Sequence, residues 1–206
     1  MRTLTATTQA TITPASAIKL LKEGNHRFVQ NLKFNRNLLE QVNETKDGQY
    51  PFAAILSCMD SRTSAELVFD QGLGDIFSIR IAGNVLNTDI LGSMEYACKV
   101  VGSKLIVVLG HTKCGAIKGA CAGVKMDNLT GLLDKVKPAI SEADTLLPNA
   151  DKSTTQFVET VAEKNVLNTV KQILEESPIL RDLYEANKIG IVPAMYIVES
   201  GEVTFL

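Results

Sequence analysis

The chain has 206 residues, of which 45% are hydrophobic and 21% charged, a balance typical of one globular domain with a sizeable core. The formal net charge is −2 and no apolar run approaches a membrane span of roughly 20 residues, so we expect neither a nucleic-acid partner nor a membrane partner. Four cysteines are too few for a secreted disulfide scaffold, which favours free thiols or metal ligands, with the cytoplasm as the default location.

The N-terminal segment, residues 1–35, predicts a helical arm on a single domain that spans residues 1–206. Met1 to Thr13 is rich in Thr and Ala and lacks the apolar stretch of a signal peptide, so we expect a flexible arm, or one that folds over a partner subunit. Thr13-Pro14 is typical of an N-cap followed by proline at the first helical position. Apolar residues then recur at helical spacing and predict an amphipathic helix over 14–32, with a short second helix between 33 and 49.

The remainder of the chain, residues 50–206, predicts an α/β core. Short apolar runs indicate buried strands, and apolar residues at a helical period indicate helices. The expected strands cover 52–57, 76–81, 105–109, 191–198 and 203–206, and the expected helices begin at a capping box over Thr63–Glu66 and cover 88–101, 128–143, 155–176 and 178–187. This alternation favours a central, mostly parallel sheet flanked by helices. Ser200-Gly201 between the last two strands predicts a C-terminal hairpin strand.

Two of these strands end in residues that can carry chemistry. The 52–57 strand leads into Cys58, and the 105–109 strand leads into a segment that contains His111 and Cys114. Ligands of open parallel sheets bind beyond the carboxyl ends of the strands, so the three side chains converge if the two strands are neighbours. Two thiolates and one imidazole suit zinc, and three protein ligands leave the fourth tetrahedral position open, as in catalytic zinc sites.

The other cysteines and the second histidine have simpler interpretations. Cys98 shares the apolar face of its helix, and Cys121 lies two turns down the helix expected after Cys114, so both are interpreted as packing residues. His26 lies in the first helix and is interpreted as a surface or packing residue. A lone buried Cys or strand-end His usually has the same explanation, but ligands at two separate strand ends beside a polar cluster favour a metal site.

Asp60 and Arg62 form the second feature of the first strand end. Arg62 can hold the Asp60 carboxylate through a bidentate pair. The pair would keep Asp60 ionised and able to accept a hydrogen bond from a metal-bound water. Taken alone, the same pair would be interpreted as an ion pair at the start of a helix.

At this point the chain resembles a known family. Cys58-x-Asp60-Ser61-Arg62 followed by His111-x-x-Cys114 resembles the signature of β-class carbonic anhydrases, and the likeness covers at least residues 49–123 through Arg80-Ile81-Ala82-Gly83-Asn84, Glu95-Tyr96 and Gly115 to Gly119. The resemblance implies one Zn2+ per chain on the two cysteines and His111, with Asp60 and Arg62 as the catalytic dyad. It implies reversible hydration of CO2 to bicarbonate and a proton through zinc-bound hydroxide. Movement of Asp60 from Arg62 to the zinc at low pH is a hypothesis that the resemblance adds.

The resemblance also bears on the substrate pocket and the subgroup. Plant-like members carry a Gln, a Phe and a Tyr at the places of Gln49, Phe77 and Tyr96, and the resemblance implies substrate binding by these residues and Gly115. Bicarbonate-regulated members carry a Trp where this chain has Ile55, so we expect the constitutively open, plant-like type I subgroup. Without the resemblance, Phe77 and Tyr96 would be interpreted as packing residues.

The resemblance further implies a homodimer, or a dimer of dimers, with CO2 and bicarbonate as its small-molecule partners. Gln49, Phe77 and Tyr96 would reach the zinc across the dimer interface, and the N-terminal helix would embrace the partner. Two alternatives stay open at this level. One is a zinc hydrolase of a CO2 analogue such as CS2, and the other is a non-catalytic zinc-binding relative with a structural or regulatory role.

Overall fold

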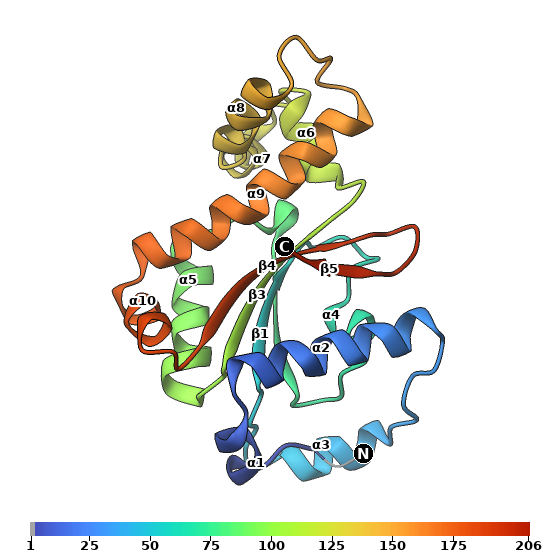
Figure 1. Cartoon of the computed structure of the whole chain (residues 1–206), viewed down its shortest axis with the longest axis vertical. Coiled ribbons are helices and arrows are strands. Elements are labelled where there is room, and N and C mark those ends of the chain that lie inside the picture. Colours follow the sequence, from blue (N-terminus) through green and yellow to red (C-terminus); the bar gives the residue numbers. More distant parts are fainter. Residues whose placement is uncertain (1–2) are drawn as a thin grey trace.

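A five-stranded sheet organises the computed structural model, which describes residues 3–206 (Figure 1). Its strand order is β2-β1-β3-β4-β5; the first four strands run parallel, and β5 is antiparallel to β4. The strands are β1 (Ala53–Ser57), β2 (Ile76–Arg80), β3 (Leu105–His111), β4 (Gly190–Tyr196) and β5 (Val203–Phe205). The predicted mostly parallel sheet and C-terminal hairpin are therefore confirmed. Of the predicted N-terminal arm, residues 1 and 2 lie outside the described residues.

Helices cover both faces of the sheet, which explains why the central strands are apolar throughout. Along β3, Leu105, Val107 and Leu109 belong to the core on one face, whereas Ile106 and Val108 belong to the core on the other. All five side chains are 0 or 1% exposed. The buried run from 105 to 109 is therefore a strand between two helical layers.

Figure 1 shows how the helices are divided between the two faces. One face is covered by α2 (Pro14–Val29) and α4 (Ala65–Val68), and the other by α5 (Thr88–Glu95), its π-helical continuation η2 (Tyr96–Val101), α9 (Thr155–Glu176) and α10 (Pro178–Glu185), while α1 (Ala6–Thr11) and α3 (Leu38–Thr45) lie below the lower end of the sheet in this view. The 3-10 turn η1 (Ala82–Asn84) follows β2, and α6 (Gly115–Cys121), α7 (Asp127–Asp134) and α8 (Lys137–Leu146) gather beyond one end of the sheet. None of the helices formed by residues 3–206 combines the length and the apolar character that a membrane crossing needs.

The N-terminal segment is part of this chain's own fold. Residues 6–11 form α1, so the expectation of a flexible arm is wrong there; buried Gln9 donates from Nε2 to the Pro51 carbonyl at 2.8 Å. The buried face of α2 includes Ala17 and Leu21, which join the core beneath β1 and β3. The amphipathic face predicted over 14–32 therefore covers the sheet of its own chain.

Three predicted helices differ in their details. The 88–101 helix changes from α to π geometry at Tyr96, and the 128–143 segment is divided into α7 and α8. The predicted capping box at Thr63–Glu66 is wrong: Ser64 is the N-cap of α4 but its side chain makes no capping hydrogen bond. The Thr63 hydroxyl donates instead to the carbonyls of Cys58 and Asp60, at 3.0 and 2.9 Å, because these loop carbonyls lack ladder partners.

Candidate metal centre

The parallel pairing of β1 and β3 brings the two strand ends together. Ser57 pairs with Leu109, so Cys58 leaves β1 beside the last residues of β3, where His111 lies. Cys114 follows three residues later, as the N-cap of α6. Cys58, His111 and Cys114 are all buried, and their ligand atoms lie within 4.8 Å of one another. The predicted convergence of the three side chains is confirmed.

The separations within this cluster suit a tetrahedral zinc ion. The Sγ atoms of Cys58 and Cys114 are 3.9 Å apart, and two Zn–S bonds of about 2.3 Å at a tetrahedral angle place sulfurs about 3.8 Å apart. His111 Nδ1 lies 2.8 Å from the Thr112 carbonyl, which makes Nδ1 the protonated nitrogen. Its Nε2 is buried and has no hydrogen-bond partner among the described residues. A buried imidazole lone pair beside two sulfurs fits a metal ligand.

The contact between the two thiols of the cluster favours the binding of a cation. The Cys114 thiol stabilises a Cys58 thiolate and so lowers the pKa of Cys58. The same contact raises the pKa of Cys114, because a second negative charge would lie beside the first. Two thiolates at this distance require a neighbouring cation, and Zn2+ offsets both charges. By contrast, burial raises the pKa of Cys98 to about 12, in keeping with its interpretation as a packing residue.

Asp60 and Arg62 form a bidentate ion pair beside the cluster. Arg62 Nε donates to Asp60 Oδ1 at 2.9 Å and Arg62 Nη2 donates to Oδ2 at 2.7 Å. The Arg62 backbone N–H adds a third bond to Oδ1 at 2.9 Å. These hydrogen bonds hold the pKa of the Asp60 carboxyl well below its usual range, so it is ionised and fixed in direction.

Arg80 holds the loop that carries this pair. Its Nε donates to the Cys58 carbonyl at 3.1 Å and its Nη2 donates to the Asp60 carbonyl at 2.6 Å. The motif around Arg80 does not by itself indicate this role. Its position at the end of β2, which neighbours β1, could have indicated the contact.

Of the four predicted substrate-binding residues, Gly115 lies beside the cluster, whereas Gln49, Phe77 and Tyr96 of the same chain are not gathered around it. Gly115 is exposed at the first residue of α6, next to Cys114, and an added Cβ would meet open space there. Gln49 is exposed in the loop that precedes β1, at the opposite end of the strand from Cys58. Phe77 pairs with Ala54, and four residues of strand, about 13 Å at 3.3 Å per residue, separate Ala54 from Cys58.

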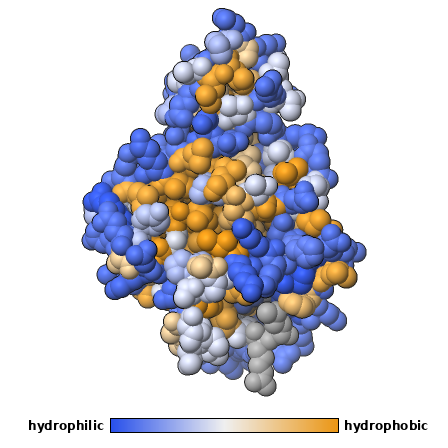
Figure 2. All heavy atoms as spheres, in the orientation of Figure 1, coloured by the Kyte–Doolittle hydropathy of each residue, from blue (hydrophilic) through white to orange (hydrophobic). Residues whose placement is uncertain are grey.

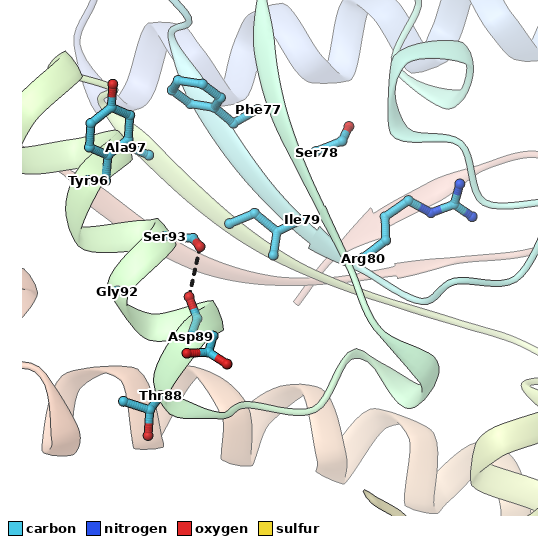
Figure 3. Close-up of a pocket in the computed structure, with 10 residues that line it drawn as sticks. All are labelled: Phe77, Ser78, Ile79, Arg80, Thr88, Asp89, Gly92, Ser93, Tyr96 and Ala97. Atoms are coloured by element: carbon cyan, nitrogen blue, oxygen red, sulfur yellow. Dashed lines mark hydrogen bonds between the residues drawn. The ribbon is translucent and has the colours of Figure 1, made fainter. Parts of the chain in front are cut away.

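Phe77 and Tyr96 instead line a separate open pocket of about 800 Å3 along β2 and α5. Their rings meet edge to face, with centroids 6.5 Å apart. Figure 3 shows the two rings at one end of the pocket and the Arg80 side chain extending away from them. Tyr96 is also the first residue of a π-helical turn, which the sequence periodicity does not indicate.

The chain matches a known protein family and known proteins in sequence. Residues 53–203 match the family model described as "Carbonic anhydrase". The chain is 36% identical over 194 residues to "Carbonic anhydrase 2" of Mycobacterium tuberculosis strain H37Rv, covering 91% of this chain and 90% of that protein. It is also 36% identical over 197 residues to "Carbonic anhydrase" of Mycolicibacterium smegmatis, covering 92% of each.

Solved structures agree in fold. The β-carbonic anhydrase CcaA superposes with a TM-score of 0.73 at 25% identity, covering 92% of this chain and 94% of that one. CafA, the β-carbonic anhydrase of Aspergillus fumigatus, superposes with a TM-score of 0.74 at 22% identity, covering 93% and 89%.

Proposed function

The chain belongs to the β-class of carbonic anhydrases, and from that premise we propose which of its residues perform the reaction. The reaction is the reversible hydration of CO2 to bicarbonate and a proton, with zinc as the cofactor. We assign the zinc to Cys58, His111 and Cys114. The observation that carries this assignment is the unpartnered, buried His111 Nε2 beside two sulfurs at a tetrahedral separation.

Asp60 is proposed to orient the water that adds to CO2. Zinc, when bound, lowers the pKa of a water ligand toward about 7 and so supplies hydroxide near neutrality. The Asp60 carboxylate accepts three hydrogen bonds from Arg62, and a carboxylate has about four lone-pair sites, so one remains for a hydrogen bond from that water. Arg62 keeps the carboxylate ionised and aimed, and Arg80 holds the peptide that carries it.

The pairing of Asp60 with Arg62 also supports the open, plant-like type I subgroup. An aspartate engaged in a bidentate pair leaves the fourth ligand position available for water. Ile55 is a core residue of β1 with no exposed surface, in the place where bicarbonate-regulated members are expected to carry a Trp. No observation favours CS2 hydrolysis or a purely structural role over this assignment.

We further propose that the functional unit is a homodimer that joins two copies along the β2 edge. The pocket formed by Phe77 and Tyr96 opens at this edge, and Tyr96 and Val100 are 56% and 70% exposed. Figure 2 shows hydrophobic residues gathered across the middle of the molecule, over the region where Figure 1 places the sheet between α5 and α2. A second copy would bring its own Phe77 and Tyr96 toward the cluster, which one chain does not do.

A larger assembly is compatible with this unit, since two relatives from Sordaria macrospora with the same fold are described as tetrameric. Within each copy we take residues 1–206 as a single domain, in which 50–206 forms the catalytic core. The N-terminal helices complete that domain by covering their own sheet.

The assignment is tested by zinc analysis and stopped-flow CO2 hydration at about pH 8.5. Cys114→Ala is expected to lose zinc and activity, whereas Cys121→Ala, the same change on α6, is expected to keep both. Asp60→Asn is expected to keep zinc and lose about 10²- to 10⁴-fold in kcat/KM, because the amide does not replace the carboxylate that accepts the hydrogen bond of the reacting water. Full zinc content in Cys114→Ala, or full activity in Asp60→Asn, would contradict the assignment.

A further inference from the structure

Helix α9 contacts the metal centre although none of its residues belongs to the signature motifs. Asn165, which is 4% exposed, donates from Nδ2 to the Gly83 carbonyl at 2.9 Å. The Gly83 backbone N–H in turn donates to Cys58 Sγ at 3.3 Å. An N–H directed at a sulfur stabilises negative charge there and fixes the direction of its lone pairs. Asn165 thus acts on one thiolate through Gly83.

Asn165 holds a turn of unusual backbone shape. Within η1, Gly83 and Asn84 both have positive φ, +67° and +44°, values that depart from 3-10 geometry. The turn follows β2 and is buried at both residues. Asn165 contacts this turn from α9, which packs across β3 and β4. The Gly83 N–H that donates to Cys58 is therefore held by a helix packed against the sheet.

The same helix holds the loop of the second thiolate. Lys113, between His111 and Cys114, has a φ of +54°, a conformation that residues with a side chain rarely adopt. Its backbone N–H donates to Glu159 Oε1 at 2.8 Å. The Glu159 carboxylate therefore stabilises the turn that brings Cys114 back toward His111.

From these contacts we propose that Asn165 and Glu159 are positioning residues of the zinc centre, through which α9 holds the two cysteine loops at the separation that zinc requires. Neither side chain contacts a ligand directly: Asn165 acts through Gly83, and Glu159 acts through Lys113. The proposal rests on the assignment of zinc to Cys58, His111 and Cys114. It predicts a loss of zinc affinity that exceeds any general loss of stability.

The first test uses a matched pair of asparagines on α9. Asn168 also donates from Nδ2 at 2.9 Å, but to the Glu142 carboxylate on α8. Asn165→Asp replaces an amide donor with a carboxylate that faces the Gly83 carbonyl oxygen, and Asn168→Asp does the same opposite the Glu142 carboxylate. We expect a roughly 10- to 100-fold higher zinc dissociation constant in Asn165→Asp, measured by competition with a chromophoric chelator. Asn168→Asp is expected to match the wild type, and the thiolate-to-cobalt absorption of the Co2+-substituted protein is expected to change only in Asn165→Asp.

The second test uses Glu159. If Asn165→Asp does not fold, this test by itself decides whether α9 positions the zinc centre. Glu159→Ala is expected to weaken zinc binding by a similar factor, whereas Glu159→Gln keeps an oxygen for the Lys113 N–H and is expected to restore most of the affinity. Glu163→Ala, an exposed position one turn along α9, is the control. Equal zinc affinity of either variant and its control overturns the proposal. A failure of the ligand assignment itself is recognised separately, because Cys114→Ala would then retain zinc.

Discussion

Asp70 is a buried carboxylate whose two arginine partners precede β1 in the chain. Its side chain is 2% exposed, Arg27 Nε donates to Oδ2 at 2.6 Å, and Arg36 Nη1 donates to Oδ1. Burial alone would raise the pKa of this carboxyl, but the hydrogen bonds from Arg27 and Arg36 outweigh it, and the pKa lies below its ordinary value. Asp70 also has a φ of +45°, so the pair fixes an unusual backbone turn.

The stability that Asp70 contributes is expected to depend on pH. Because the folded pKa is depressed, the contribution is fully present above the unfolded pKa of about 3.9 and is lost as pH falls through the folded pKa. Asp70→Asn should lower the free energy of unfolding by roughly 3 kcal/mol at pH 7, because two partly buried guanidinium groups lose their counter-charge. Urea unfolding of the metal-free protein at pH 7 and near pH 3 measures this difference, which should narrow at the lower pH, and removing the metal keeps zinc release in acid out of the comparison.

Asp134→Asn is the matched control for Asp70→Asn. Its carboxylate pairs with Lys137 at 2.8 Å, but the two side chains are 50% and 68% exposed. Solvent and salt screen such a pair, so the change should cost no more than about 0.5 kcal/mol. A pH-independent cost in Asp70→Asn, or equal costs in the two variants at pH 7, would show that the arginine pairs do not stabilise the fold as described.

At the scale of elements, α2 and α4 are held in unusually close contact by a glycine. Gly24 lies in the buried face of α2, and a Cβ added to it would lie 1.8 Å from the Phe69 carbonyl oxygen, just past the end of α4. Next to it, Asn25 donates from Nδ2 to the carbonyls of Val68 and Gly201, at 3.1 and 2.8 Å. The glycine therefore permits a close approach of α2 to α4, which the bond to Val68 secures, and the bond to Gly201 ties α2 to the turn between β4 and β5.

Gly24→Ala is expected to lower the free energy of unfolding by about 1 to 3 kcal/mol, because α2 or the backbone at Phe69 must shift. Gly131→Ala offers the opposite case on α7: the position is exposed and nothing lies within 4 Å of an added Cβ. There the change should raise stability by about 0.5 to 1 kcal/mol, as for glycine within a helix. Chemical denaturation of both variants measures the difference, and a neutral Gly24→Ala would contradict the close packing.

At the scale of the whole molecule, the open question is how the substrate pocket is completed. Asp60, Arg62 and the metal cluster are built by one chain. Phe77 and Tyr96 lie along β2 and η2 at an edge that ends in exposed apolar side chains. The proposed dimer would supply the apolar pocket for CO2 from the Phe77 and Tyr96 side chains of the second copy.

A charge at this edge is expected to separate the dimer and reduce activity together. Val100→Glu introduces a carboxylate at a 70% exposed position on η2, whereas Val124→Glu makes the same change at a 39% exposed position after α6. Sedimentation velocity should show a monomer only for Val100→Glu, with zinc retained and CO2 hydration lowered. A dimeric, fully active Val100→Glu protein would place the interface elsewhere.

The sequence by itself determined the features that depend on residues close together along the chain. Apolar runs identified the five strands, and residue types at two strand ends predicted the cluster of Cys58, His111 and Cys114 before any coordinates. These predictions succeed because strand periodicity depends only on nearby residues. In addition, parallel strands have their carboxyl ends on the same side of the sheet, so the residues that follow them lie close together.

Only the tertiary structure decided which distant residues support that cluster. Asn165 and Glu159 reach the cysteine loops from a helix that lies far along the chain, and helical periodicity says nothing about such contacts. The tertiary structure likewise decided that the N-terminal helices pack on their own sheet and that the helix takes π geometry from Tyr96. The physical reason is that hydrogen bonds between elements depend on how faces are layered in space, whereas sequence patterns record only which face each element must bury.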